Sequence, residues 1–294
     1  MEISGTGVPL VTPFDDAGDV DHAALADVAE WVVDRGVEFV VPCGSTSEAP
    51  LLTAAERVAV VETVADAVSV PVIAGTGTDG LERTRRLTDR VADVGADAAL
   101  VVTPHYYPHD ADTLADYYRD VADAVPVPTY LYSVPAFTGV SLAPETVGSL
   151  ASHPNVTGIK DSTGDLDAFQ RAQARTADGF THLVGAGGVY ANALDAGAAG
   201  GILALANVVP EVASAVRAAH ESDDRERAHR LNDAARELNH AVTAEHGIPG
   251  MKAALRSRGV PAGRARRPHR PVDEPTADRL GELVAETLAA AHLG

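Results

Sequence analysis

Short apolar runs alternate with segments of helical periodicity along the first two thirds of the chain. The short runs are rich in β-branched residues and bounded by Gly or Pro, as strands are. The segments between them repeat apolar residues every three or four positions, which is typical of helices that pack one face against a sheet. The pattern predicts eight strands, at Gly7–Phe14, Phe39–Cys43, Pro71–Gly75, Ala98–Thr103, Thr129–Ser133, Val156–Lys160, His182–Gly185 and Gly201–Leu205.

Residues that begin and end helices support the segments expected between these strands. Thr53 opens a capping box, and Asp110 or Asp112 is placed to cap the helix that contains Leu114. Gly36 and Gly95 stand where glycines end helices. The expected helices include His22–Arg35, Ala54–Ala67, Leu81–Val94, Thr113–Ala124 and Asp165–Thr176.

Eight strands with crossover helices of this length predict an α/β fold, a (β/α)8 TIM barrel. A doubly wound sheet is the competing fold, but its first turn would carry a G-x-G-x-x-G motif, and Thr12–Asp16 has none. The strand pattern stops after residue 210, and helical segments follow at Glu211–His220, Asp224–Glu245, Gly250–Arg258 and Thr276–His292. We expect residues 1–223 to form the barrel and 224–294 a C-terminal helical extension of the same domain.

Composition narrows the class of protein. The 294 residues are 46% hydrophobic, no apolar stretch approaches the roughly 20 residues of a membrane helix, and the first residues do not resemble a secretory signal. Cys43 is the single cysteine, so no intramolecular disulfide or cysteine-based metal site is expected. A net charge of −19 argues against nucleic acid and anionic membrane as partners. We expect a cytoplasmic protein whose acidic, lysine-poor surface is suited to concentrated salt.

Lysine usage points to the chemistry. The chain has 21 arginines and two lysines, and Lys160 lies in the apolar run Val156–Gly164. Burying an ammonium group is costly, and desolvation favours the neutral, nucleophilic amine that forms a Schiff base with a carbonyl substrate. The alternative is a lysine that extends to solvent from an edge strand, but Ile159 and the eight-strand pattern favour a central strand.

The carboxyl ends of the predicted strands carry a coherent set of groups, and barrel enzymes build their sites there. Ser45 and Thr46 offer hydroxyls and turn amides for a small carboxylate, and Tyr132 offers a phenol for proton transfer. No carboxylate pair, metal triad or Ser-His-Asp set occurs at these ends. Singly, Ser45 and Thr46 could form a plain turn and Tyr132 could be packing; together with Lys160 they predict imine chemistry on a keto acid.

The chain resembles the dihydrodipicolinate synthase / N-acetylneuraminate lyase family of class I, pyruvate-dependent aldolases. The likeness covers nearly all of the sequence, and its G-S-T-x-E and G-x-K-D-S motifs are specific together. The matching segments are Gly7–Phe14, Gly44–Glu48, Val102–Tyr107, Tyr132–Pro135, Gly158–Ser162 and Gly201–Asn207.

The resemblance implies a role for each of these residues. Lys160 would form the Schiff base, and Ser45 and Thr46 would hold the pyruvate carboxylate. Tyr132 would relay protons, and Tyr106 from the neighbouring subunit of a dimer would take part in that relay. The family implies a keto acid substrate, a homotetramer built as a dimer of dimers, and no metal or organic cofactor. The resemblance also implies substrate contacts at Gly44, Ser162, Gly185 and Ile202.

One position departs from the pattern of the synthases that condense pyruvate with aspartate semialdehyde. Those enzymes place an arginine where this chain has Phe137, and a phenyl ring cannot pair with a carboxylate. The acidic residue of sialic acid lyases is also missing, because Gly185–Gly188 occupies that loop. We therefore expect cleavage of a 2-keto-3-deoxy sugar acid, such as 2-keto-3-deoxygluconate or its 6-phosphate, to pyruvate and an aldehyde. Ser162 would bind a sugar hydroxyl, and His109 could help bind a phosphate.

Three alternatives stay open from the sequence. One is 4-hydroxy-tetrahydrodipicolinate synthase, and another is a sugar acid dehydratase or hydratase-aldolase of the same family. The third, from a different class, is a catalytically silent barrel that serves binding or assembly. A product assay separates sugar-acid cleavage, which releases pyruvate, from the synthase reaction, which gives a cyclic condensation product. An unchanged activity in Lys160→Ala would favour the silent barrel.

Overall fold

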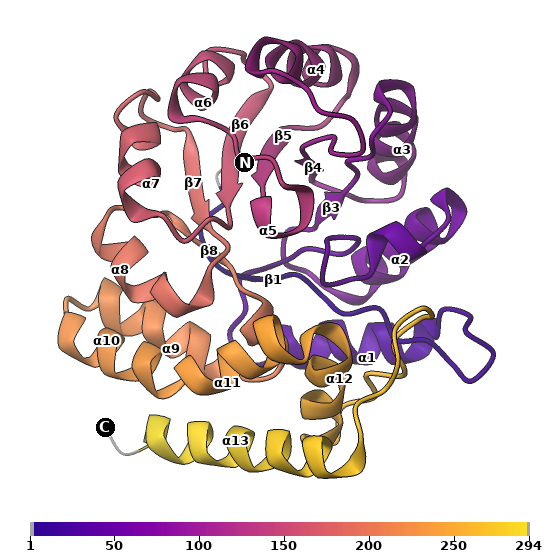
Figure 1. Cartoon of the computed structure of the whole chain (residues 1–294), viewed down its shortest axis with the longest axis vertical. Coiled ribbons are helices and arrows are strands. Elements are labelled where there is room, and N and C mark those ends of the chain that lie inside the picture. The colour runs from indigo at the N-terminus through magenta and orange to yellow at the C-terminus, as the bar shows by residue number, and fades with distance from the viewer. Residues whose placement is uncertain (1–2, 293–294) are drawn as a thin grey trace.

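The computed structural model describes residues 3–292 of the chain, and a closed barrel of parallel strands forms its centre (Figure 1). The strands are hydrogen-bonded in the order β2-β1-β8-β7-β6-β5-β4-β3. A parallel bridge between Val40 and Val72 joins the β2 and β3 ends of this order, which closes the barrel. The predicted (β/α)8 TIM barrel is therefore confirmed. The strands are β1 Gly5–Val8, β2 Phe39–Val40, β3 Ile73–Gly75, β4 Ala98–Val102, β5 Thr129–Ser133, β6 Val156–Asp161, β7 Thr181–Val184 and β8 Gly200–Ile202.

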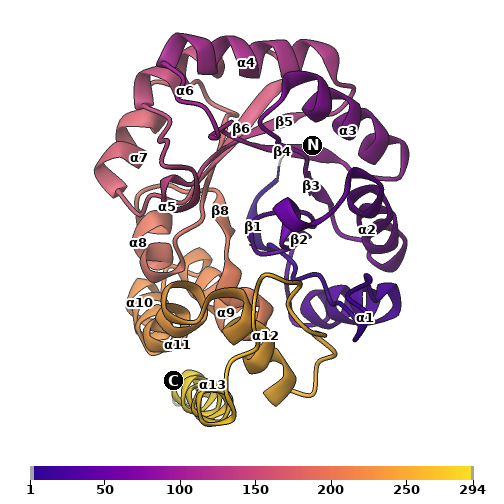
Figure 2. The same cartoon turned by 45° about the vertical axis from the view of Figure 1, so that its right-hand side comes forward.

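Helices surround the strands, and the later ones gather along one side of the barrel (Figure 2). The capping box at Thr53 is present, the side chain of Asp110 caps α4, and Gly36 and Gly95 adopt positive φ as expected of helix-ending glycines. The helices are α1 His22–Val33, α2 Ala54–Ala67, α3 Leu81–Asp93, α4 Ala111–Ala124, α5 Pro135–Thr138, α6 Pro144–Leu150, α7 Leu166–Gln173, α8 Tyr190–Asp195, α9 Pro210–Glu221, α10 Arg225–Ala234, α11 Arg236–His240, α12 Gly247–Ser257 and α13 Glu274–His292.

Several predicted boundaries were wrong. Buried loop residues are as apolar as strand residues, and buried positions continue the helical period across breaks between helices. β1 ends at Val8 instead of Phe14, because the apolar residues that follow are buried in a loop outside the ladder. β8 ends at Ile202, and Ala204–Asn207 forms a 3-10 turn. The single helix expected over 224–245 is divided into α10, α11 and a π-helical turn. The sequence does not indicate these divisions, because the buried positions keep the helical period throughout.

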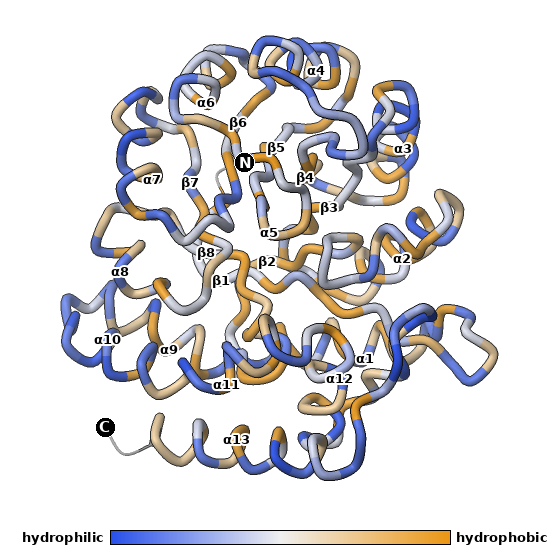
Figure 3. The backbone as a smooth tube through the Cα atoms, in the orientation of Figure 1, coloured by the Kyte–Doolittle hydropathy of each residue, from blue (hydrophilic) through white to orange (hydrophobic). Residues whose placement is uncertain are grey.

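The core has two layers because successive residues of a strand point to opposite faces. One layer fills the barrel interior and the other lies between the strands and the helices, so both faces of the strands are apolar. Figure 3 accordingly colours parts of several strands as hydrophobic. On β6, Ile159 belongs to the outer layer and its neighbour Lys160 points inward. Strand alternation therefore directs the lysine into the barrel.

The helices after residue 223 pack against the barrel's own helices. α10 packs on α8 and α9, and α12 packs on α13. The division at residue 223 stays a prediction, since the extension has no core separate from these contacts. Within residues 3–292, no helix combines the length and apolar character needed to span a membrane.

Candidate active site

Lys160 and Tyr132 meet inside the barrel near the carboxyl ends of β6 and β5. The two residues are directly paired in the parallel ladder, and each is 4% exposed. The Nζ atom of Lys160 lies 4.3 Å from the centroid of the Tyr132 ring. This contact brings a buried amine and a phenol together inside the barrel.

The loop after β2 brings hydroxyls to the same place. The Ser45 Oγ lies 3.4 Å from the Tyr132 hydroxyl oxygen, and Ser45 and Thr46 are both half-buried. The loop reaches the barrel centre because Gly75 on β3 has no side chain. A Cβ on Gly75 would lie 2.0 Å from the carbonyl oxygen of Cys43, so any larger residue would push the loop away.

Cys43, which precedes this loop, is the chain's single thiol and is buried. Burial raises the pKa of Cys43 to about 12. The thiol therefore stays protonated at neutral pH, and it is not a competing nucleophile.

A glycine at the end of β7 makes room for the lysine. A Cβ on Gly185 would lie 1.8 Å from Ser162 Oγ and 3.0 Å from Lys160 Cε. The Ser162 backbone N–H donates to the Ser133 carbonyl at 2.9 Å, which holds Ser162 at the end of β6. Gly185, Ser162 and Lys160 are thus immediate neighbours, and the predicted contact residues of strands 6 and 7 converge.

The remaining predicted residues divide into two groups. Ile202 is fully buried in the barrel interior, and Gly44 is buried at the start of the loop that carries Ser45. Tyr106, in contrast, is 75% exposed and packs edge-on against Tyr107 at 5.0 Å. Within the described residues, Tyr106 makes no hydrogen bond to Tyr132, so one chain does not bring these two phenols together.

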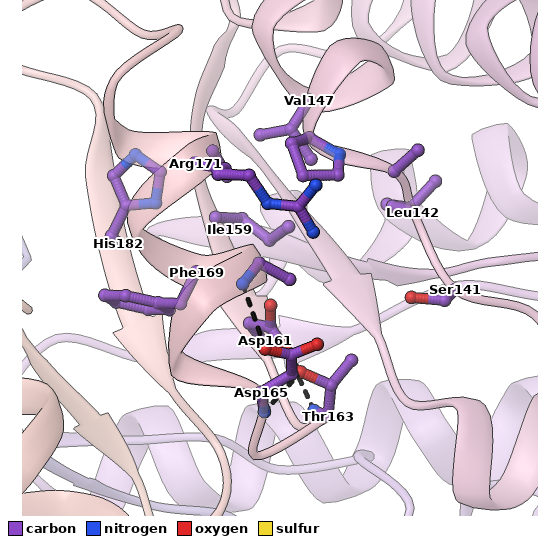
Figure 4. Close-up of a pocket in the computed structure, with 14 residues that line it drawn as sticks. Ser141, Leu142, Val147, Ile159, Asp161, Thr163, Asp165, Phe169, Arg171 and His182 are labelled. Carbon is purple, nitrogen blue, oxygen red and sulfur yellow. Dashed lines mark hydrogen bonds between the residues drawn. The ribbon is translucent and has the colours of Figure 1, made fainter.

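A pocket of about 280 Å³ lies on the outer face of β6 between α6 and α7 (Figure 4). Asp161 lines it, and burial raises the pKa of this carboxyl, although bonds from Thr163 oppose the shift. His182 lies on the same side, where burial lowers its pKa to about 4. Because this pocket opens on the face of β6 opposite to Lys160, it is separate from the amine and phenol inside the barrel.

The sequence analysis did not identify the second lysine, Lys252, as a buried residue next to the site. Lys252 on α12 is fully buried, and its Nζ lies 2.7 Å from Glu48 Oε1 at the end of the Ser45 loop. The rarity of lysine was the signal that could have identified it, because the argument made for Lys160 applies equally to Lys252. Nothing in the pattern of α12, however, indicated which carboxylate it would meet.

A barrel whose interior presents a lysine amine beside a phenol and a hydroxyl-bearing loop belongs to the class of (β/α)8-barrel enzymes. A family model described as the Dihydrodipicolinate synthetase family matches residues 2–287. The chain therefore belongs to this family, whose members are lyases of the aldolase type.

Curated proteins and solved structures that resemble the chain support the same family assignment. The chain is 40% identical to an uncharacterized DapA-like lyase of Halobacterium salinarum, over 93% of this chain and 90% of that protein. It is 35% identical to the 4-hydroxy-tetrahydrodipicolinate synthase of Haloarcula marismortui, over 97% and 94% of the two chains. The dihydrodipicolinate synthase of Acinetobacter baumannii, solved with pyruvate, matches with a TM-score of 0.92 and 32% identity over 97% and 99% of the two chains.

Proposed function

We propose that the chain is a Schiff-base aldolase that reversibly cleaves a 2-keto-3-deoxy sugar acid to pyruvate and an aldehyde. The observation that carries this proposal is the buried Lys160 amine 4.3 Å from the Tyr132 ring, next to the hydroxyl of Ser45. A structure of the similar Acinetobacter baumannii synthase contains pyruvate, and so does one of the Escherichia coli protein YagE, at 29% identity and a TM-score of 0.92.

The chemistry assigned to these residues is as follows. The hydroxyls and turn amides of Ser45 and Thr46, with Gly44, bind the substrate carboxylate. The Lys160 amine attacks the C2 carbonyl, whose oxygen leaves as water to give an iminium ion. The Tyr132 phenol gives its proton to the departing oxygen, and the resulting phenolate then accepts the proton of the C4 hydroxyl as the C3–C4 bond breaks. The bonding electrons pass into the iminium to form an enamine. Protonation of the enamine at C3 and hydrolysis of the resulting imine release pyruvate and free the lysine.

The identity of residue 137, a phenylalanine, is the reason for proposing a sugar acid as the substrate. This residue lies on α5, directly after β5, and is 69% exposed. A phenyl ring at this place offers no charge to a second carboxylate, and the loss of a charge-assisted bidentate pair disfavours aspartate semialdehyde as the partner. In this proposal Ser162, which neighbours Gly185, binds a sugar hydroxyl through its Oγ.

A second candidate, 4-hydroxy-tetrahydrodipicolinate synthase, is favoured by the relatives. The curated proteins of that name from Geobacter metallireducens and Haloarcula marismortui each share 35% identity with this chain. The two candidates use the same lysine and differ in the aldehyde that meets the enamine.

The test has two parts. Borohydride reduction with pyruvate, followed by peptide mapping, should place a pyruvyl adduct on Lys160, and Lys160→Ala should give none; a folded protein without an adduct would overturn the aldolase proposal. Incubation with 2-keto-3-deoxygluconate, its 6-phosphate, or pyruvate plus aspartate semialdehyde then separates the candidates. Pyruvate release from a sugar acid supports the first, and a cyclic condensation product supports the second.

We also propose that the active assembly is a homotetramer built as a dimer of dimers, in which Tyr106 completes a neighbour's proton relay. Tyr106 and Tyr107 are large aromatic residues that stand exposed together, which suits burial against a second copy of the chain. The same assembly would supply the phenol that a single chain keeps away from Tyr132.

A further inference from the structure

Beneath the loop that carries Ser45 and Thr46, a second lysine lies buried with a carboxylate. The side chains of Lys252 and Glu48 are 1% and 0% exposed, and their charged atoms lie 2.7 Å apart. Burial lowers the pKa of Lys252 to about 8, although Glu48 opposes the shift, so the pair is held at a desolvation cost. A buried ion pair is often no more stabilising than apolar residues of the same shape, which raises the question of what this one does.

Every hydrogen that the ammonium can donate is used. Nζ donates to the carbonyl of Thr12 at 2.6 Å, to Glu48 Oε1 at 2.7 Å and to the carbonyl of Arg264 at 2.7 Å. The other carboxylate oxygen of Glu48 accepts from the Arg266 backbone N–H at 2.8 Å. Lys252 on α12 therefore joins the chain after β1, the loop after β2 and the segment that leads to α13.

The loop itself needs such support. It has no regular secondary structure between Gly44 and Glu48, and it begins and ends with non-glycine residues in the left-handed region, Cys43 at φ 59° and Glu48 at φ 60°. Residues in that region are strained and persist only where their surroundings fix them. Two bonds tie the loop to the chain after β1: Ser47 Oγ donates to the Leu10 carbonyl at 2.5 Å, and Thr12 Oγ1 donates to the Ser47 carbonyl at 2.8 Å.

We propose that the Glu48–Lys252 pair is a positioning device for the carboxylate-binding loop. It fixes the left-handed Glu48 and thereby aims the hydroxyls and turn amides of Ser45 and Thr46 into the barrel. A charged pair with all its bonds made accepts one geometry, whereas an apolar contact of the same area would accept several. The inference rests on the proposed function, since it assigns these hydroxyls to a substrate carboxylate.

The test replaces both charges at once, because a single change would strand the other charge in the core. We expect Glu48→Gln/Lys252→Met to fold, with each single variant less stable than the double. In the double variant, the pyruvate concentration for half-maximal borohydride trapping should rise at least about tenfold, while trapping at saturating pyruvate stays within about threefold of wild type. Amide hydrogen exchange over residues 44–49 should accelerate by a similar factor.

A matched control removes another ion pair. Arg258 and Glu211 also lie 2.7 Å apart, but they are 15% and 31% exposed and belong to neither the loop nor the barrel interior. Arg258→Met/Glu211→Gln should therefore leave the half-saturating pyruvate concentration and the exchange of residues 44–49 unchanged. If the control variant raises the half-saturating pyruvate concentration and the exchange rate as much as Glu48→Gln/Lys252→Met does, the effect is general destabilisation and the positioning role is wrong.

The outcomes separate the two proposals. Wild-type half-saturation and wild-type loop exchange in the folded double variant would overturn the positioning role. If the wild-type protein forms no adduct, the proposed function fails, and the exchange measurement still decides whether the pair orders the loop. Should the double variant not fold, Glu48→Asp keeps both charges but withdraws the carboxylate by one methylene, and it should show the same two changes.

Discussion

At the scale of single residues, the Tyr132 hydroxyl is the group whose removal tests the mechanism most directly. Tyr132→Phe keeps the ring that contacts Lys160 and removes the oxygen 3.4 Å from Ser45 Oγ. We expect kcat to fall by about 10²–10⁴-fold, the usual contribution of a positioned acid–base group. Steady-state kinetics measures the loss, and borohydride trapping should still label Lys160.

Tyr190 on α8 provides the matched control for this change. Its hydroxyl is buried as well, but it lies 3.0 Å from Thr6 Oγ1 on β1 and does not contact Tyr132. Tyr190→Phe should cost about 1 kcal/mol of stability and leave kcat unchanged. An equal loss of kcat in both variants would contradict a proton-transfer role for Tyr132.

The space left by Gly185 gives a second prediction at this scale. In Gly185→Ala, the new methyl group would meet Ser162 Oγ at 1.8 Å and Lys160 Cε at 3.0 Å, so at least one of them must move. We expect adduct formation on Lys160 to slow by at least about tenfold, since small displacements of a reacting group are costly. Gly188→Ala is the control, because its nearest neighbour would be the Asn239 amide at 3.9 Å; equal trapping rates in the two variants would show that the lysine tolerates the methyl group.

At the scale of elements, β7 and α7 enclose a histidine, His182, whose burial should make the fold sensitive to acid. His182 is 5% exposed, contacts the rings of Phe169 and Phe180, and shares a 2.9 Å hydrogen bond with Thr176. Figure 4 shows its ring beside Phe169 at the edge of the outer pocket. Burial lowers its pKa to about 4 from an ordinary value of 6.5, so in that range the unfolded chain binds a proton that the folded chain does not.

Stability should therefore fall as pH drops from about 6.5 to about 4, by roughly 2–3 kcal/mol from this group alone. In His182→Gln, which cannot take up the proton, the decline over this window should be smaller by that amount. Chemical denaturation at a series of pH values measures the slope. His22→Gln, on the exposed surface of α1, should keep the wild-type slope, and a wild-type slope in His182→Gln as well would assign the acid sensitivity to other groups.

For the whole molecule, the proposed assembly predicts complementation between two defective chains. A chain with Lys160→Ala keeps Tyr106, and a chain with Tyr106→Phe keeps Lys160. If Tyr106 acts across an interface, random co-assembly should restore about a quarter of wild-type activity, from one complete site in half of the dimers. Activity measured after mixing in denaturant and refolding tests this, with each variant refolded alone as the control. No gain on mixing, with hybrids shown to form, would place Tyr106 outside the partner's site.

The net charge of −19 predicts that folding depends on salt. The Debye length falls from about 10 Å in 0.1 M salt to about 3 Å in 1 M salt, so repulsion between surface carboxylates weakens. We expect a higher unfolding midpoint in concentrated KCl than in dilute buffer. Sucrose at equal osmolality is the control, because it does not screen charge. Full folding and activity in dilute buffer would contradict the prediction.

The sequence by itself determined the barrel and most of the residues that meet inside it. Strand and helix periods are local properties, and the alternation along β6 directs Lys160 and Ile159 to opposite faces whatever the rest of the chain does. Because the carboxyl ends of parallel strands share one edge, the strand pattern alone groups Ser45, Tyr132 and Lys160.

The tertiary structure decided what depends on contacts between distant segments. Glu48 and Lys252 are 204 residues apart, and no period in the sequence indicates that α12 lies beneath the loop after β2. The ends of β1 and β8 were likewise set by where the ladder stops, since buried loop residues are as apolar as strand residues. The hydrophobic pattern indicates which face of a helix or strand is buried. The segment that packs against that face is decided only when the whole chain folds.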